Sequence, residues 1–262
     1  MSLAAAIERL NFAGPAFAPG EVWLAGAGPG SAGCLTLEVV HALSCADAVV
    51  YDALVEPAIL EAAQGAERHF VGKRGGQPST PQPEINALLV SLAKAGKRVL
   101  RLKGGDPNLF GRGGEEALAL AEAGIPFRVL PGMTSALGAL AEAGIPATMR
   151  GINRAVTLAT GHAVGTDEDL DWAAIARAGQ PIVIYMGLKN LGQIAAALAQ
   201  GGLPADTPAA VIASATTGRQ RIVVATLATL SNEAEREGIE APALIVIGQI
   251  VAMREKLKGW AG

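Results

Sequence analysis

The sequence predicts an α/β protein of two domains, each built on its own sheet. Its 262 residues are enough for two domains of usual size. Short runs rich in Val, Ile and Leu alternate with longer runs rich in Ala and Leu, which is typical of α/β folds. Half of the residues are hydrophobic and only 4% are aromatic, so we expect an aliphatic core.

The first half of the chain predicts a parallel five-stranded sheet. Its strand-like runs are short and apolar on both sides, as buried parallel strands are, and helical runs separate them. The expected strands are Glu21–Gly28, Asp47–Asp52, Glu67–Lys73, Lys97–Lys103 and Pro126–Gly132. The expected helices are Leu35–Ala46, Pro83–Gly96 and Glu115–Gly124. Crossovers between parallel strands should be right-handed.

A loop-like stretch at 147–155 marks the expected domain boundary. We therefore predict an N-terminal extension at 1–20, an N-terminal α/β domain at 21–147 and a C-terminal α/β domain at 148–262. The second half again alternates strands and helices. In it, the stretch 214–221 (SATTGRQR) lies between two strand-like runs and indicates a hairpin, so the second sheet is expected to be mixed.

Charge and hydropathy exclude several classes of partner. The net charge is −3 and the pI is about 5.7, which favours neither nucleic acid nor an acidic membrane. The chain shows no signal-peptide pattern and no apolar run of membrane-spanning length. The three histidines, His41, His69 and His162, lack the spacing of metal ligands. We expect a soluble cytoplasmic protein without a metal.

The stretch 101–117 (RLKGGDPNLFGRGGEEA) joins an expected strand to an expected helix. In open parallel sheets, ligands bind beyond the carboxyl ends of the strands. Gly104 and Gly105 would let the backbone approach a ligand closely, and Asp106 could accept hydrogen bonds from it. A turn role for Asp106 stays open, as does an ordinary first-turn helix role for Glu115 and Glu116.

Two other strand ends carry candidate residues. The stretch 28–33 (GPGSAG) matches the dinucleotide pattern G-x-G-x-x-G, but Pro29 removes one of its N–H groups, and a tight turn is an alternative. Thr134 and Ser135 open a helix after the fifth strand, either as N-caps or as ligand contacts. Met186 ends a later strand, either in the core or at a ligand.

Taken together in their order, the motifs of this chain resemble one family. They are GAGPG, YDALV, VGKRGG, RLKGGDP, FGRGGEEA, PGMTSA, AGIP and YMG. The set resembles the uroporphyrinogen-III C-methyltransferases of the tetrapyrrole methylase family over about 21–250, in their stand-alone form. The resemblance implies two α/β domains with an active-site cleft between them, a homodimer, and S-adenosyl-L-methionine as the methyl donor, which leaves as S-adenosyl-L-homocysteine.

The resemblance also implies roles for individual residues. Asp52 is the implied proton acceptor, Lys73 a possible proton donor, and Arg112 a catalytic residue that faces the substrate. The implied cofactor contacts are Pro29, Gly104, Gly105, Asp106, Leu109, Thr134, Ser135, Met186 and Ala215. The implied substrate contacts are Arg74, Arg112, Glu115, Arg150 and Tyr185.

The implied reaction is methylation of uroporphyrinogen III at C2 and then at C7, giving precorrin-2 for porphyrin, cobalamin or siroheme biosynthesis. Methylation of a later corrin precursor, or of diphthamide or rRNA, stays an alternative on the same fold. A nicotinamide-dependent dehydrogenase and a non-catalytic tetrapyrrole-binding protein are the alternatives from other classes.

Overall fold

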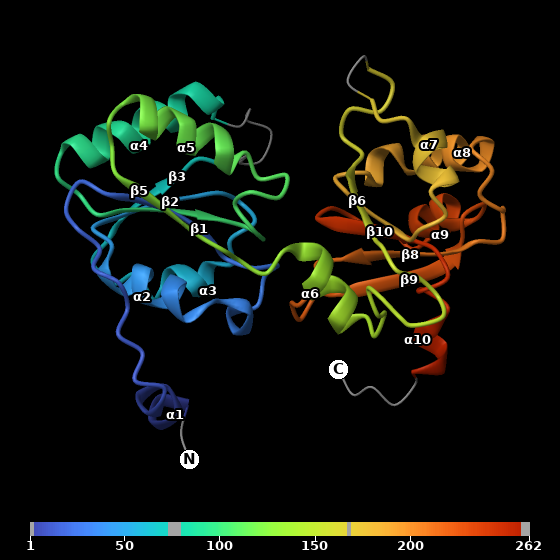
Figure 1. The fold of residues 1–262 in the computed structure, drawn as a ribbon, viewed down its shortest axis with the longest axis horizontal. Helices are drawn as coiled ribbons and strands as arrows, with labels where there is room; N and C mark the ends of the chain where they lie inside the picture. Colours follow the sequence, from blue (N-terminus) through green and yellow to red (C-terminus); the bar gives the residue numbers. More distant parts are fainter. Residues whose placement is uncertain (1–2, 73–79, 167–168, 258–262) are drawn as a thin grey trace. The chain divides into compact units, whose positions relative to one another are not determined.

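A computed structural model describes residues 3–72, 80–166 and 169–257. The chain forms two compact units, which are residues 1–28 with 32–132 and residues 29–31 with 133–262 (Figure 1). The division falls between Gly132 and Met133, whereas the loop at 147–155 was the expected boundary. The physical reason is helix α6 (Ser135–Glu142), which packs on strand β10 (Ala243–Ile247) of the second unit.

The first unit contains the predicted parallel sheet, with its strands in the order β3-β2-β4-β1-β5. All of its pairings are parallel, so this prediction is confirmed. The strands are β1 (Val22–Gly26), β2 (Ala48–Tyr51), β3 (Glu67–Phe70), β4 (Val99–Lys103) and β5 (Phe127–Leu130). Strand β4 is the middle strand and is buried along its whole length.

Helices cover both faces of this sheet (Figure 1). Helices α2 (Leu37–Cys45) and α3 (Pro57–Leu60) share one core with Leu100 and Leu102 of β4. Helices α4 (Gln82–Lys94) and α5 (Gly113–Glu122) share the other core with Val99. Because side chains alternate along a strand, Arg101 and Lys103 lie on the face that α4 and α5 cover. The remaining helical segments of this unit are α1 (Leu3–Arg9) and the short 3₁₀ helix Ala32–Cys34.

The strand order creates a switch point between β1 and β4. The chain leaves β1 toward α2 on one face of the sheet and leaves β4 toward α5 on the other. Adjacent strands whose connections diverge in this way open a crevice at their carboxyl ends, which is where open α/β sheets bind ligands. The stretch 104–112 lies at this position.

The second unit contains a mixed sheet with its strands in the order β6-β7-β10-β8-β9. Only β6 and β7 pair in parallel, and β8 and β9 form the predicted hairpin. Besides β10, the strands of this sheet are β6 (Thr157–Thr160), β7 (Ile182–Tyr185), β8 (Pro208–Ala213) and β9 (Arg221–Thr226). The helices are α7 (Trp172–Arg177), 3₁₀ helix Leu188–Asn190, α8 (Leu191–Gln200), α9 (Leu230–Arg236) and α10 (Met253–Lys256). Apolar residues of α7, α8 and α9 form one core with the sheet.

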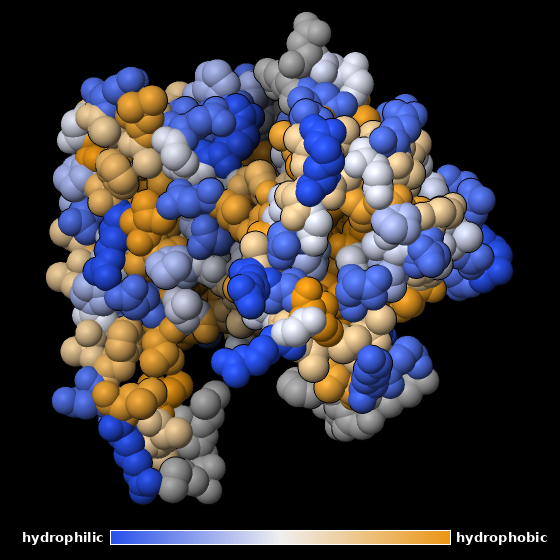
Figure 2. Space-filling view, turned by 45° about the vertical axis from the view of Figure 1, so that its right-hand side comes forward, coloured by the Kyte–Doolittle hydropathy of each residue, from blue (hydrophilic) through white to orange (hydrophobic). Residues whose placement is uncertain are grey.

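On the face seen in Figure 2, hydrophilic and hydrophobic residues are intermingled on both units. Within the described ranges, no helix is both long and apolar enough to cross a bilayer. The same ranges contain no group of three or more His, Cys, Asp or Glu side chains placed to hold a metal ion.

Three glycines bring the ends of β1, β4 and β5 into backbone contact. A Cβ on Gly26 would lie 2.5 Å from the Gly105 carbonyl oxygen and 2.5 Å from Gly132 Cα. A Cβ on Gly132 would meet the same carbonyl and would lie 2.6 Å from Gly26 Cα. Gly105 also has φ +70 and pairs with Gly28 through two backbone hydrogen bonds. Any side chain here would force the strand ends apart.

We predict that Gly132→Ala destabilises the fold by about 1–3 kcal/mol, the usual cost of overpacking. Gly114→Ala is the matched control, because a Cβ at Gly114 in α5 meets no heavy atom within 4 Å. It should be neutral or slightly stabilising, since Ala favours helix over Gly. Urea unfolding of both variants measures the difference. Equal midpoints for Gly132→Ala and the wild type would contradict the account.

An ion pair joins β2 to β4 at their amino ends. Arg98 donates to Asp47 from its backbone N, its Nε and its Nη2, over 2.8, 2.9 and 2.7 Å. The side-chain hydrogen bonds and then the backbone hydrogen bond from Arg98 hold the pKa of the Asp47 carboxyl at about 2, below its ordinary value. Both side chains are more than a third exposed, so solvent screens the pair.

We predict that Asp47→Asn lowers the free energy of unfolding at pH 7 by about 1 kcal/mol or less, the range of exposed ion pairs. A carboxyl whose pKa is lowered by folding stabilises the protein fully above its unfolded pKa of about 4. That stabilisation is lost as the pH falls through the folded pKa of about 2. Thermal melts should therefore differ at pH 7 and converge between about pH 4 and pH 2. A difference that grows on acidification would refute this prediction.

Candidate active site

Asp106 ties two strand ends together at the switch point. Its Oδ1 accepts a hydrogen bond from the Asn108 backbone N at 2.9 Å, and its Oδ2 accepts one from Gly132 N at 3.1 Å. The bond from Asn108 shows that Asp106 does act as a turn residue, which was the alternative role. Each oxygen of an ionised carboxylate has a further lone pair, so Asp106 can still accept a hydrogen bond from a ligand. Gly104 lies beside it and contacts Leu54, where a Cβ would come within 2.6 Å of the Leu54 Cβ.

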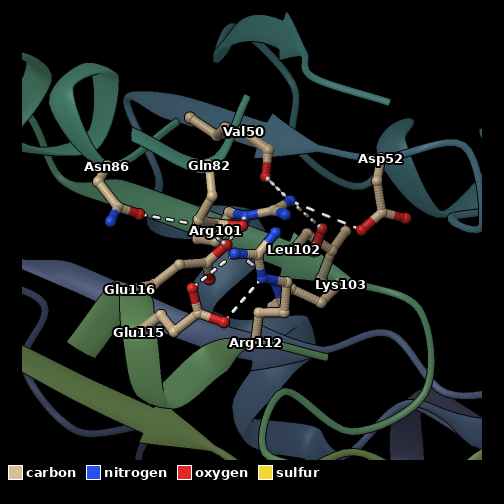
Figure 3. A network of polar contacts seen from close by, with 10 residues as sticks. All are labelled: Val50, Asp52, Gln82, Asn86, Arg101, Leu102, Lys103, Arg112, Glu115 and Glu116. Atoms are coloured by element: carbon tan, nitrogen blue, oxygen red, sulfur yellow. Dashed lines mark hydrogen bonds and ion pairs between the residues drawn. The ribbon is translucent and has the colours of Figure 1, made fainter. Parts of the chain in front are cut away.

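A network of buried charges lies beneath this loop (Figure 3). Glu116 is fully buried, and its Oε1 accepts hydrogen bonds from Arg101 Nε at 3.0 Å and from Lys103 Nζ at 2.8 Å. Gln82 of α4 donates to the same oxygen at 3.3 Å. Burial lowers the pKa of the Lys103 ammonium, and the charge of Arg101 adds to this, while Glu116 opposes it. The network fixes α5 against the middle strand of the sheet.

Asp52 follows β2 and lies at the edge of this network. Its Oδ1 accepts a hydrogen bond from Leu54 N at 3.0 Å, and its Oδ2 lies 3.7 Å from Arg101 Nη1. A quarter of its side chain is exposed. A partly exposed carboxylate can accept a proton, which is the role that the resemblance implies for Asp52.

Arg112 and Glu115, both predicted as substrate contacts, bind each other. Arg112 Nε and Nη2 donate to the two oxygens of Glu115 over 2.7 and 2.6 Å. These hydrogen bonds raise the pKa of Arg112 and lower that of Glu115. Arg112 has φ +58 at the start of α5, a conformation that is uncommon for a residue with a side chain. The pair is more than half exposed, so it can exchange partners at low cost.

In the second unit, Tyr185 contacts another candidate, Thr134. Its hydroxyl lies 2.6 Å from Thr134 Oγ1 and accepts a hydrogen bond from Ala136 N at 3.2 Å. Tyr185 is buried at the end of β7, and its hydroxyl caps the N-terminus of α6 by accepting the hydrogen bond from Ala136 N. Thr134 occupies the N-cap position without making a side-chain cap, and Ser135 is the first residue of α6. Tyr185 thus contacts Thr134, a residue implied to bind the cofactor, and its implied substrate contact stays a prediction.

The remaining candidates of the second unit lie in strained or tightly packed backbone. Met186 has φ +53 and is half exposed directly after β7. Ala215 is buried between Ser214 and Thr216, which both have positive φ. Such outliers in residues with side chains cluster at functional sites. Pro29 packs on α6, where a Cβ on Gly138 would lie 2.6 Å from its Cγ.

Other candidates are less constrained or lie outside the described residues. Leu109 is half-buried in the stretch after Asp106, and Arg150 is exposed in a turn after α6. Lys73 and Arg74 fall outside the described residues. The structure thus groups Asp52, Asp106 and the β4–α5 loop in the first unit, and the contacts of Tyr185 in the second.

The dinucleotide alternative does not fit the geometry of the stretch 28–33. In that motif the last glycine leads into a helix whose N-terminus holds the pyrophosphate. Here α2 begins only at Leu37, after a separate 3₁₀ turn. In that motif an acidic residue about 20 positions on binds the ribose. Asp47 and Asp52 lie at that distance, and Asp47 is already bound by Arg98. The backbone of Gly28 is paired with Gly105.

Sequence reasoning missed the buried network. Its signal was present in the strand 99–103 (VLRLK), where two cations alternate with apolar residues. Cations on one face of a central strand are buried and need a partner, and Glu116 one turn into the next helix was the available carboxylate. Gln82 gave no comparable signal.

The geometry fits a ligand that donates hydrogen bonds and approaches the backbone. The Gly26, Gly105 and Gly132 contact has no room for a side chain, and Asp106 offers its remaining lone pairs beside it. The ribose hydroxyls and the ammonium group of S-adenosylmethionine are donors of this kind. The residues at the switch point therefore fit that cofactor.

Comparison with known proteins gives the family. The family model of the tetrapyrrole (corrin/porphyrin) methylases matches residues 21–231. A uroporphyrinogen-III C-methyltransferase from Sinorhizobium sp is 49% identical over 255 residues, which is 96% of this chain and 91% of that protein. A siroheme synthase of Pseudomonas fluorescens is 49% identical over 257 residues, which is 98% of this chain but 55% of that protein. The chain thus spans about half the length of that relative.

A solved structure of a similar enzyme supports the same family. The uroporphyrin-III C-methyltransferase of Thermus thermophilus, in complex with S-adenosylhomocysteine, superposes with a TM-score of 0.76 at 37% identity, over 89% of this chain and 99% of that one. The predicted fold class and the predicted family are both confirmed. The chain belongs to the tetrapyrrole methylases.

Proposed function

We propose that this chain transfers methyl groups from S-adenosyl-L-methionine to uroporphyrinogen III, at C2 and then at C7, to give precorrin-2. The observation that carries the proposal is the switch-point site of a chain of this family, where three glycines pack without room for side chains beside the carboxylate of Asp106. The close relatives with this activity in their names support it.

S-adenosylmethionine, when bound, supplies a methyl group on a positively charged sulfur. Transfer forms a carbon–carbon bond to the pyrrole and breaks the carbon–sulfur bond, whose electrons stay on sulfur. The methylated macrocycle then carries a positive charge until it loses a proton. We propose that Asp52 accepts this proton at Oδ2, the oxygen that accepts no hydrogen bond from the Leu54 backbone.

The remaining roles stay proposals. Cofactor contacts are assigned to Gly104, Gly105, Asp106 and Leu109 in the first unit, and to Pro29, Thr134, Ser135, Met186 and Ala215 in the second. The substrate, which carries eight carboxylates, is assigned the contacts Arg74, Arg112, Glu115, Arg150 and Tyr185. Tyr185 orients Thr134 in this scheme. A homodimer, a cytoplasmic location and supply of the cobalamin or siroheme pathway also stay predictions.

The direct test is anaerobic incubation with uroporphyrinogen III and S-adenosylmethionine labelled in its methyl group. We predict two labelled methyl groups per macrocycle and a product that oxidises to the pigment of precorrin-2. Asp52→Asn should bind S-adenosylhomocysteine as the wild type does, while turnover falls by about 10²-fold, the scale of losing a general base. No transfer by the wild type, or calorimetry showing binding of NAD alone, would refute the proposed function.

We predict that Arg112→Lys raises the KM for uroporphyrinogen III about tenfold and leaves the affinity for S-adenosylhomocysteine unchanged. A guanidinium can bind a carboxylate through two parallel hydrogen bonds, which an ammonium cannot reproduce. Without substrate, the carboxylate that Arg112 binds in this way is that of Glu115. Arg128→Lys is the control, since Arg128 is exposed and also pairs with a glutamate, the partly exposed Glu38. Equal changes in both variants would remove Arg112 from substrate binding.

A further inference from the structure

Glu116 is buried in a manner that the proposed reaction does not explain. Its Oε1 accepts hydrogen bonds from two cations and from Gln82, whereas its Oε2 is buried without a hydrogen-bond partner among the described residues. A buried acceptor left unpaired costs stability. The carboxylate is therefore turned so that a single oxygen meets Arg101 and Lys103, at the expense of the other.

This arrangement holds the Arg101 guanidinium at a fixed place. Its Nε donates to Glu116 at 3.0 Å, and its Nη1 donates to the Leu102 and Val50 carbonyls at 3.2 and 3.4 Å. These contacts come from α5, β4 and β2, so the guanidinium is held from three directions (Figure 3). The distance from Nη1 to Asp52 Oδ2 remains 3.7 Å, too long for a hydrogen bond.

The same two strands carry a second Asp–Arg pair, which is closed in the sense that its side chains are joined by hydrogen bonds. At the amino ends of β2 and β4, Arg98 binds Asp47 through two side-chain hydrogen bonds of 2.7 and 2.9 Å. There the arginine holds the pKa of the carboxyl at about 2. An aspartate closed in this way is a poor proton acceptor near neutral pH, because an effective general base has a pKa near the working pH. At the carboxyl ends of the strands, the corresponding pair of Asp52 and Arg101 is open, because its side chains lie 3.7 Å apart without a hydrogen bond.

We propose that Glu116 is a positioning residue, which holds Arg101 near Asp52 without letting it close on Asp52, so that Asp52 stays available to accept a proton. The inference rests on the proposed function, in which Asp52 is the acceptor. Arg101 Nη1 stays 3.7 Å from Asp52 Oδ2 in this arrangement. Glu116 thus acts through Arg101 and does not touch the substrate in this scheme.

Removal of the Glu116 charge should let Arg101 form a hydrogen bond with Asp52. In Glu116→Gln, Arg101 and Lys103 lose their shared anion, and Asp52 is the carboxylate that Arg101 already approaches. A guanidinium gains more from a bidentate carboxylate than from a neutral amide. Arg101 is therefore expected to shift toward Asp52 and to form the kind of pair that Arg98 forms with Asp47.

The test is a double-mutant cycle on methyl transfer to uroporphyrinogen III. We expect Glu116→Gln to lower kcat about tenfold, a part of what a general base contributes, with the KM for S-adenosylmethionine unchanged. In the Asp52→Asn background the same change should have no further effect on kcat, since residues that act through one group are not additive. Asp47→Asn is the control, since it removes a charge pair between the same strands and should keep full kcat.

Each outcome decides between the alternatives. An equal loss of kcat from Glu116→Gln in the wild-type and Asp52→Asn backgrounds, or no loss in either, would overturn the inference and leave the proposed function standing. No methyl transfer by the wild type would overturn both. If Glu116→Gln does not fold, Glu116→Asp keeps the charge but shortens the reach to Arg101, and the same non-additivity with Asp52→Asn is expected.

Discussion

The interaction on which the first unit depends is the burial of Arg101 and Lys103 under Glu116. Two cations on the middle strand of a sheet are tolerated in the core only because one carboxylate meets both. Breaking such a buried pair by removing one partner costs about 3–5 kcal/mol, so the pairing fixes α5 on β4. The stretch 104–112 connects these two elements, and both of its ends are therefore held. Its glycines and Asp106 are presented at the switch point from a rigid base.

Rigid and exchangeable interactions lie side by side in this stretch and the start of α5. The backbone of Gly105 is bound to Gly28 after β1, and the carboxylate of Asp106 is bound to the Gly132 backbone N after β5. This leaves little freedom at the proposed cofactor position. Arg112 and Glu115 are exposed and bind each other, so a substrate carboxylate can replace Glu115 at small cost. Adjacent glutamates in one helix turn therefore differ in role: Glu116 binds the buried cations of β4, and Glu115 binds Arg112, the proposed substrate contact.

The sequence was sufficient to predict the fold class because hydrophobic periodicity and turn residues agree along most of the chain. The five parallel strands, the mixed second sheet and the β8–β9 hairpin are confirmed. The structure divides the chain before α6, whereas the expected boundary lay after it, because α6 resembles the helices before it and only its contact with β10 assigns it to the second unit. Tyr185 capping α6 and the network around Glu116 depend on contacts between distant residues, which local patterns do not encode.

Crystal structures of the wild type and of Glu116→Gln at one pH test most directly whether Glu116 keeps Arg101 from forming a hydrogen bond with Asp52. The quantity to compare is the distance from Arg101 Nη1 to Asp52 Oδ2. We predict that it stays near 3.7 Å in the wild type and shortens to about 2.9 Å, a hydrogen-bond length, in the variant. An unchanged distance in Glu116→Gln would contradict the account, because Arg101 would then be held in place without Glu116.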